Sequence, residues 1–330
     1  MKICPLAAES LGVRSVATYV ECGDTRILID PGAALAPTRF GLPPADEEWE
    51  ALRRANDRIS GYAARANWIF VSHYHEDHFR FDPSLYAGRS VWAKDPRRMM
   101  VAKQEGRAAE LWKALAGRCR LDAAEGRRYE TPDCILHASP PLSNGLEGSG
   151  QGFVVALTVT DRREGFRFVH ASDVQGPLSP VAAAYLARER PNLLYVSGPP
   201  SYLEAHVGRP LIEQGIDHLL RIIDQTGCQV IVDHHALRGI GHEERFRRLW
   251  DTGRVVTAAG FLRLSATPLE AQRRQLWVKR HKPAGAMAPR QKTLGQKSFG
   301  QNSLGLKRPW PSGTMTERSP LRRLKGGRSQ

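Results

Sequence analysis

A dense cluster of histidine and carboxylate side chains directly follows a short apolar run at residues 68–71. The cluster reads Ser-His-Tyr-His-Glu-Asp-His over residues 72–78, so three histidines fall within six residues of a chain that averages one histidine in thirty. Imidazole and carboxylate groups bind zinc, iron or manganese. We therefore expect a strand that ends in a short loop, with the metal-capable side chains of that loop turned toward one point. An exposed polar loop is the weaker alternative.

Strand-like and helix-like runs alternate through the first 280 residues. Runs rich in Val, Ile, Phe and Tyr predict strands at 15–22, 26–30, 68–72, 153–160, 167–171, 193–197, 229–233 and 254–257. Apolar periodicity predicts helices at 46–66, 96–116, 180–190, 209–226 and 242–251. This alternation predicts an α/β fold in which helices cover the sheets.

Three further strand ends carry metal-capable residues. They read Arg-Ile-Leu-Ile-Asp-Pro-Gly at 26–32, Phe-Val-His-Ala-Ser-Asp at 168–173 and Val-Ile-Val-Asp-His-His at 230–235. Together with the H-x-H-x-D-H spacing of residues 73–78, these segments resemble the metallo-β-lactamase superfamily of metal-dependent hydrolases. The resemblance implies an αββα sandwich, which is a layered arrangement of two mixed sheets flanked by helices.

Finer details resemble one uncharacterised branch of that superfamily, found in archaea and bacteria. The segments that carry this resemblance are residues 10–15 (SLGVRS), 41–44 (GLPP), 172–177 (SDVQGP), 198–203 (GPPSYL) and 233–238 (DHHALR). The resemblance extends over roughly residues 1–265. The H-x-H-x-D-H motif is specific by itself, and the other segments gain weight from their order.

The resemblance implies a centre of two adjacent divalent metals, Zn²⁺ with Mn²⁺ or Fe²⁺ as alternatives. It assigns the first metal to His73 and His75, the second metal to Asp77 and His78, and a bridge between the two metals to Asp173.

The last strand ends in two neighbouring histidines, His234 and His235, of which one is needed to complete the second metal site. We favour His234 because it lies nearer the strand end. The other histidine then fixes the tautomer and orientation of a ligand. Asp30, at the end of the early strand, would brace the metal loop.

One position departs from the family pattern. The resemblance implies a third histidine for the first metal, after a Ser-Pro-Pro stretch, but Ser139-Pro140-Pro141 is followed by Leu-Ser-Asn-Gly. Asn144 therefore stands where a histidine is expected, and an amide oxygen is a weaker zinc ligand than imidazole. His137 is the alternative third ligand if the loop shifts, although an ordinary histidine at a strand end is the simpler interpretation.

A pair of divalent metals ~3.5–4 Å apart lowers the pKa of a shared water toward ~7. The resemblance thus implies a hydrolase that uses a metal-bound hydroxide on a small ester, lactone, thioester or phosphoester. Asp77 or Asp173 would accept the water proton or orient the hydroxide. Arg238 would hold an anionic group of the substrate, with a surface salt bridge as the alternative. Tyr202 would form a pocket wall with the Gly-Pro-Pro loop before it, unless that loop is a plain turn.

Two other function classes stay open. A nuclease acting on RNA or DNA is the runner-up, but only 61 positions separate Asp173 from His234, which leaves no room for an added domain. The third class is a catalytically impaired metal-binding protein, which Asn144 would explain if it replaces a ligand.

The net charge of +14 is concentrated in the last fifty residues, which hold eleven Lys or Arg and one acid. This basic segment is low in apolar residues and nearly repeats every five residues, so we expect a disordered tail at 283–330. We therefore expect a hydrolase domain at 1–270 and a terminal helix or linker at 271–282. The tail is the part of the chain that offers a nucleic-acid contact, through sequence-independent attraction to phosphate.

The apolar stretch at 152–159 is too short for the ~20 residues that span a bilayer. The N-terminus lacks the apolar core of a signal peptide, and the five cysteines are odd in number and never spaced as CxxC. We therefore expect a cytoplasmic protein that acts on a small molecule and has no membrane segment.

Overall fold

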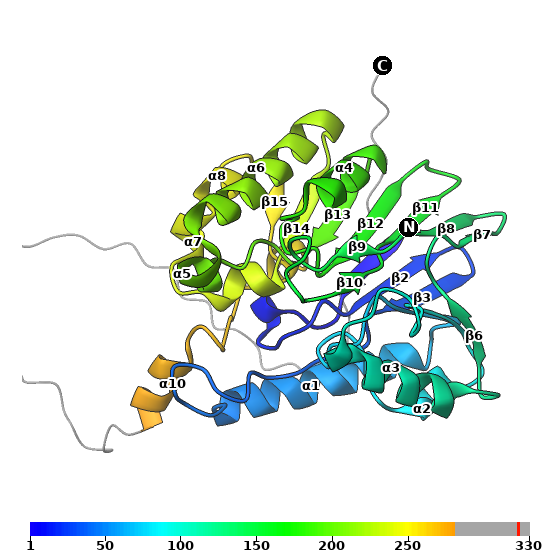
Figure 1. Ribbon diagram of the computed structural model, residues 1–330, viewed down its shortest axis with the longest axis horizontal. Helices are drawn as coiled ribbons and strands as arrows, with labels where there is room; N and C mark the ends of the chain where they lie inside the picture. Colours follow the sequence, from blue (N-terminus) through cyan, green and yellow to red (C-terminus); the bar gives the residue numbers. More distant parts are fainter. Residues whose placement is uncertain (281–321, 324–330) are drawn as a thin grey trace, which may run out of the picture.

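A computed structural model of the chain describes residues 1–280 and 322–323. Two seven-stranded sheets lie face to face, and helices cover the outer side of each sheet (Figure 1). Both sheets mix parallel and antiparallel pairs. The structure confirms the predicted fold class, a layered α/β sandwich of two mixed sheets flanked by helices.

The first sheet begins with antiparallel strands and continues with parallel ones. Its spatial order is β16 (Arg322–Arg323), β1 (Lys2–Pro5), β2 (Thr18–Cys22), β3 (Thr25–Ile29), β4 (Trp68–Val71), β5 (Ser90–Ala93) and β6 (Arg120–Ala123). From β3 to β6 each strand runs parallel to its neighbour. The residues of β16 belong to the predicted tail, and the rest of that tail lies outside the described residues.

The second sheet repeats this plan. Its spatial order is β7 (Arg128–Glu130), β8 (Cys134–Ala138), β11 (Leu157–Asp161), β12 (Arg167–Ser172), β13 (Leu193–Val196), β14 (Gln229–Val232) and β15 (Val255–Val256). The strands are antiparallel as far as β12 and parallel from β12 to β15. A small separate ribbon pairs β9 (Leu142–Ser143) with β10 (Phe153–Val154).

The helices form two outer layers, and several are a single turn long. Figure 1 shows α1 to α3 on one side of the sandwich and α4, α6 and α8 on the opposite side. The α-helices are α1 (Asp46–Ala63), α2 (Pro83–Tyr86), α3 (Ala102–Leu115), α4 (Pro180–Arg188), α5 (Glu204–Val207), α6 (Arg209–Thr226), α7 (His242–Arg245), α8 (Arg247–Trp250), α9 (Ala258–Phe261) and α10 (Arg273–Arg280). Short 3₁₀ turns are η1 (Glu9–Leu11), η2 (Ser201–Leu203) and η3 (His234–Arg238).

The parallel strands of the second sheet are buried on both faces. In β13, Tyr195 packs in the core shared by the two sheets, whereas its neighbour Leu194 packs against α4 and α6. Successive side chains of a strand point to opposite faces, so a strand covered on both sides reads as a continuous apolar run. This is why the sequence alone reveals these strands.

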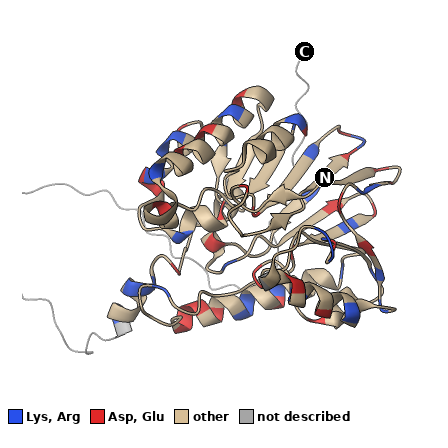
Figure 2. Cartoon of the chain, in the orientation of Figure 1, with Lys and Arg blue, Asp and Glu red and all other residues tan. Residues whose placement is uncertain are grey.

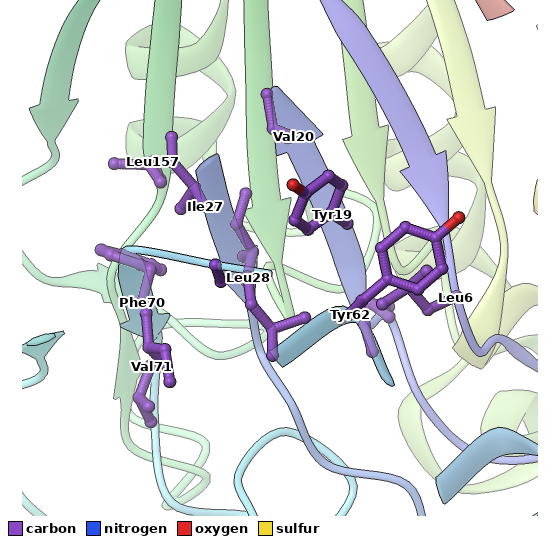
Figure 3. Packing of buried hydrophobic residues seen from close by; sticks show 14 of the residues in the cluster. Leu6, Tyr19, Val20, Ile27, Leu28, Tyr62, Phe70, Val71 and Leu157 are labelled. Carbon is purple, nitrogen blue, oxygen red and sulfur yellow. The ribbon is translucent and has the colours of Figure 1, made fainter. Parts of the chain in front are cut away.

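The core between the two sheets is continuous. Figure 3 shows Ile27, Leu28 and Phe70 of the first sheet in the same cluster as Leu157 of the second. All four side chains are at most 1% exposed. Full burial of such a side chain contributes about 1.5–3 kcal/mol. The core therefore fixes how the strand ends of the two sheets face each other.

Charged side chains of both signs lie along the outer helices. Figure 2 shows Lys and Arg interleaved with Asp and Glu along α1 and α6. The helix α1 buries Ala51, Ala55 and Ile59, but Trp49, expected on the same apolar face, is 55% exposed. Among the described residues, no helix combines the length and apolarity needed to cross a membrane.

Several predicted elements differ in detail from the structure. The run at 153–160 is divided into β10 and β11, and the predicted helix at 242–251 is two single turns that break at Phe246. The strands β1, β5, β6, β7, β8 and β9 were not predicted. They are short, and β6 and β7 carry half-exposed or exposed charged residues, so they lack the apolar run that marks the central strands.

Candidate metal centre

Apart from the alternatives Asn144 and His137, every residue predicted to bind metal follows the carboxyl end of a strand in a parallel pair. The histidine-rich loop follows β4, Asp173 follows β12, and His234 and His235 open η3 directly after β14. In each sheet the carboxyl ends of parallel neighbours meet at the same edge, where α/β proteins form their binding sites. The fold therefore brings residues that are up to 162 positions apart in sequence to one place.

The backbone turns sharply where these strands end. Asp30, Ser172 and His234 have φ angles of 46°, 51° and 53°, in the left-handed region that non-glycine residues rarely adopt. Such conformations persist only where the surrounding structure enforces them, and they concentrate at functional sites. Position 32 has room only for glycine, because a Cβ there would lie 2.5 Å from the backbone nitrogen of Phe79 and 2.7 Å from that of His78.

Asp30 joins the two sheets beneath the cluster. Its Oδ1 accepts a hydrogen bond from the Ser72 backbone N–H at 2.8 Å. Its Oδ2 accepts from the hydroxyls of Ser72 and Ser172, each at 2.7 Å, and from His78 Nδ1 at 3.0 Å. Because His78 donates from Nδ1 to Asp30, its Nε2 is the nitrogen that is left to face a metal. This is the arrangement expected of a residue that braces the metal loop.

The first predicted metal position contains two imidazoles and one carboxylate. His73 Nε2 lies 3.0 Å from His75 Nδ1 and 3.8 Å from Asp173 Oδ2. One ligand atom from each of these three residues lies within 4.8 Å of the others. On the far side of His75, Nε2 lies 3.3 Å from the side-chain amide of Gln104, which projects from α3.

The second predicted position has more ligands available. His234 Nε2 lies 3.4 Å from Asp77 Oδ2, and His78 Nε2 lies 3.9 Å from Asp77 Oδ1. Asp173 stands between the two positions, with Oδ2 3.4 Å from His78 Nε2 and Oδ1 3.6 Å from His234 Nε2. All of these residues are buried except Asp77 at the cavity edge, whose side chain is 15% exposed.

The two neighbouring histidines have different surroundings. His235 Nε2 lies 3.2 Å from Asp173 Oδ2, and its Nδ1 lies 3.0 Å from the hydroxyl of Tyr202, whose ring is stacked on it. Arg238 Nη1 donates to the same hydroxyl at 3.3 Å. Because Arg238 donates a hydrogen bond to the Tyr202 hydroxyl, that hydroxyl donates its own hydrogen bond to His235. His235 then carries its proton on Nε2 and donates a hydrogen bond to Asp173.

Arg238 also contacts the second position directly. Its Nη2 lies 2.7 Å from His234 Nε2 and 3.2 Å from Asp77 Oδ2. A metal held by those two atoms has to displace this contact. Arg238 keeps other anchors, because Nε donates to Glu9 Oε2 at 3.3 Å and Nη1 to Tyr202.

The residues present fit a divalent metal. His78 Nε2 and Asp173 Oδ1 are buried and have no hydrogen-bond partner among the described residues. A buried polar atom without a partner costs about 1–3 kcal/mol, so a ligand at this point relieves a definite penalty. Imidazole and carboxylate donors of this kind suit Zn²⁺, Mn²⁺ or Fe²⁺.

The pKa values favour the forms that bind metal. Burial opposes ionisation of Asp77 and Asp173, but the neighbouring imidazoles outweigh it and hold the pKa of both carboxyls well below the usual value. Burial lowers the pKa of His73 and His234 well below the usual value, so both are neutral. Burial also disfavours the charged form of His78, but facing carboxylates, above all Asp173, raise its pKa, and a metal there has to displace a proton.

The two alternatives for the third ligand of the first metal, Asn144 and His137, have different surroundings. Asn144 is buried, and its Oδ1 accepts a hydrogen bond from Gln175 Nε2 at 2.7 Å. His137 lies in β8, where its Nδ1 faces Glu189 at 3.8 Å and its side chain is 33% exposed. His137 belongs to none of the groups of potential metal ligands in residues 1–280 and 322–323.

Sequence reasoning missed several residues that support the cluster. Gln104, Gln175 and Glu9 come from segments without any metal-like motif, and only the fold brings them near the histidines. Ser72 and Ser172 do carry a signal, because each directly precedes a predicted ligand at a strand end. Glu9 is fully buried, and burial together with Glu270 raises its pKa to about 8.

A cavity of about 680 Å³ opens beside the cluster. His75, Asp77, Asp173 and His235 form part of its wall. Tyr202 and Arg238, which the sequence suggested for substrate binding, also line it. The candidate ligands are therefore buried on the protein side and accessible from one direction.

Comparisons with solved structures give weak similarities. An isothiocyanate hydrolase from Delia radicum gut bacteria is 13% identical, with 78% of this chain and 96% of that chain covered and a TM-score of 0.48. A metal-dependent hydrolase of the β-lactamase superfamily, Tm1679, is 14% identical, with the same coverage and a TM-score of 0.46. Similarity this low says nothing about the reaction of this chain.

Sequence relatives are much closer, although no protein-family model matches the chain. A UPF0282 protein of Thermococcus gammatolerans is 41% identical over 290 residues, which are 84% of this chain and 95% of the relative. One from Thermococcus kodakarensis is 39% identical over 303 residues, 88% of this chain and 99% of the relative. These matches confirm the predicted resemblance to an archaeal family. The chain belongs to the UPF0282 protein family.

Proposed function

We propose that this protein is a hydrolase that holds two divalent metal ions at the carboxyl edge of its two sheets. The observation that carries the proposal is the pair of buried, unpartnered atoms, His78 Nε2 and Asp173 Oδ1, within a cluster of imidazoles and ionised carboxylates beside a cavity. His73, His75 and Asp173 would hold one ion. Asp77, His78, His234 and Asp173 would hold the other.

Two such ions supply a water of lowered pKa and polarise a substrate carbonyl or phosphoryl oxygen. The side chains of the protein accept the proton and orient the water. Asp77 lines the cavity and is more exposed than Asp173, so it can accept the proton of the attacking water. Three imidazoles contact Asp173 and keep its carboxylate in place, so Asp173 orients the reacting water. This chemistry can hydrolyse esters, lactones, thioesters and phosphoesters.

His235 acts as a support for Asp173 in this proposal, and His234 acts as the ligand. The chain of hydrogen bonds from Arg238 through Tyr202 places a proton on His235 Nε2, and a protonated nitrogen cannot bind metal. His234 Nε2 instead faces the carboxylates of Asp77 and Asp173. Tyr202 and Arg238 are therefore positioning residues that keep the bridging carboxylate in place.

A second candidate function is a metal-binding protein with impaired turnover. It is favoured by one observation, the hydrogen bond that engages Asn144 with Gln175 at the place where the family pattern requires a third imidazole. With only two imidazoles, the first position would then hold its ion loosely or not at all.

Metal content tests the proposal. Tag-free protein purified without chelators is analysed for bound metals beside a His73→Ala/Asp77→Ala double variant, which removes one ligand from each position. The matched control is His206→Ala/Asp217→Ala, which changes the same residue types on the outer helices α5 and α6. We expect about two metals per chain in the wild type and control, and a loss of both in the double variant.

Activity is measured on the same samples with ester, lactone, thioester and phosphodiester substrates, before and after chelation and return of Zn²⁺ or Mn²⁺. Turnover that follows the metal content supports a hydrolase. One metal per chain with no turnover would favour the impaired protein. A folded chain that binds no added metal would overturn both proposals.

A further inference from the structure

The cavity beside the metal cluster has one distinctly apolar wall. Leu178, Leu203, Val207 and Leu211 line it from successive segments on the side of the second sheet, namely the loop before α4, then η2, α5 and α6. Leu146, from the loop between β9 and β10, lines it as well. Val207 and Leu146 are 37% and 36% exposed, so this wall leaves apolar surface in contact with water. Coverage of such surface by a ligand is favourable.

Each cation of the same cavity already contacts at least one carboxyl group in the metal-free protein. Arg14 makes a double contact with Glu270, at 2.6 and 2.7 Å. Arg107 pairs with Glu76 at 2.8 Å. The third cation, Arg238, is bound by Glu9 and Asp77. Among the described residues that line the cavity, every Arg or Lys therefore has a carboxylate partner.

This charge balance argues against a polyanion as the substrate. Proteins that bind nucleic acid neutralise several backbone phosphates with free Lys or Arg. A substrate with an apolar chain gains instead from each methylene that it buries against the leucine-rich wall. Asp173 and Tyr202 line the same cavity as the apolar wall, so a chain lying on the wall shares the cavity with the metal cluster.

We propose that the cavity takes the apolar chain of a carboxylic ester or thioester, with the scissile carbonyl at the metal cluster. This inference rests on the proposed hydrolase function and narrows its substrate class. In the reaction, the water oxygen forms a bond to the acyl carbon, and the bond from that carbon to the ester oxygen or thioester sulfur breaks. The leaving atom keeps the electron pair and receives a proton released by the water, so no other reactant is needed.

The first test is a series of p-nitrophenyl esters from acetate to octanoate, with bis-p-nitrophenyl phosphate for comparison, on the metal-loaded full chain. We expect kcat/KM to rise about two- to fourfold per added methylene until the wall is covered, which is the value of one buried CH₂ group. A parallel series of alkyl acetates shows which side of the carbonyl carries the chain. A rise in either series supports the inference.

The matched variants are Val207→Asp and Val181→Asp. Val207 lies on the wall, whereas Val181 is a valine on α4 that is 67% exposed and lies outside the lining of the cavity. We expect Val207→Asp to reduce the octanoate-to-acetate ratio of kcat/KM at least tenfold, and Val181→Asp to leave that ratio unchanged. Both positions are exposed, so both variants should fold, and thermal unfolding followed by circular dichroism verifies this.

Calorimetric binding of octanoate and acetate separates this inference from the hydrolase proposal. If esters are cleaved but neither chain series shows length dependence, or the phosphodiester is preferred, the chain-binding inference is wrong and the hydrolase stands. If no substrate is cleaved but octanoate binds at least tenfold more tightly than acetate, and Val207→Asp abolishes the difference, the cavity binds chains and the hydrolase proposal fails. Absence of both cleavage and chain-dependent binding overturns both.

Discussion

The two candidate metal positions of this protein are unequal, although they share Asp173 and lie side by side. The first has two imidazoles, His73 and His75, and an amide pair where a third imidazole belongs by the family pattern. The second has Asp77, His78 and His234 in close array. The comparison shows that two neighbouring positions at one sheet edge can differ in the number of imidazole and carboxylate ligands that they offer to a metal.

The inequality follows from where the ligands originate. The histidine-rich loop after β4 supplies both positions from one short segment, whereas the remaining ligands come from separate loops of the second sheet. His234 at the end of β14 reaches the second position. The loop between β9 and β10, which contains Asn144, brings no imidazole to the first.

The largest effect is expected from removal of the residue that the positions share. Asp173→Ala should abolish binding of both metals and lower kcat/KM by more than the 10- to 100-fold typical of residues that only support a ligand. Elemental analysis and steady-state kinetics measure the two effects. Asp217→Ala, on the outer face of α6, is the control. Retention of either metal by Asp173→Ala would mean that the positions are independent.

Asp30→Asn should weaken metal binding at both positions, since Asp30 braces the loop that supplies ligands to both. An asparagine keeps only one acceptor oxygen, so it cannot accept all of the hydrogen bonds that the two carboxylate oxygens receive from Ser72, Ser172 and His78. We expect metal affinity to fall about 10- to 100-fold and the free energy of unfolding to fall by about 1–3 kcal/mol. Competition with a chromophoric chelator and urea unfolding measure these quantities, with the exposed Asp57→Asn as control. Unchanged affinity would remove Asp30 from the site.

Titration of the metal-free protein with Co²⁺, followed by its visible absorption, should show two phases. The second position should fill first, because it has more charged and imidazole ligands, and the first position should bind at least about tenfold more weakly. His78→Ala should remove the tight phase and His75→Ala the weak one. If His75→Ala removes the tight phase instead, the ranking of the two positions is reversed.

A smaller effect is expected from restoring the imidazole. Asn144→His should tighten the weak phase about tenfold and so narrow the difference between the two positions, whereas Asn144→Ala should not tighten it. The same Co²⁺ titration measures both variants. No change with histidine would show that residue 144 lies too far from His73 and His75 to act as a ligand.

The smallest effect is expected at the supporting hydrogen bonds. Tyr202→Phe removes the hydroxyl that joins Arg238 to His235 and keeps the stacked ring. A hydrogen bond of this kind contributes about 0.5–1.5 kcal/mol, so kcat should fall roughly two- to tenfold while KM and metal content stay constant. A loss of metal in this variant would show that His235 is a ligand.

The fold class and most of the cluster were predictable because their signals are local. A strand buried on both faces needs a continuous apolar run, as in β4 or β13, and the ligands stand directly after such runs. The edge strands β6 and β7 escaped prediction because half-buried edges tolerate charged residues. Gln104 and Glu9 escaped because a long-range contact leaves no mark in the neighbouring sequence.

The sequence by itself determined which side chains have metal-binding chemistry, and that this chain has an asparagine at position 144, where the family pattern has a histidine. Only the tertiary structure decided that His234 faces Asp77 while His235 faces Tyr202, and that His137 lies against Glu189. The physical reason is that the identity of a side chain fixes its chemistry, whereas its direction depends on backbone angles. At His234 that angle is a positive φ, which is sustained only by the packing of two sheets against each other.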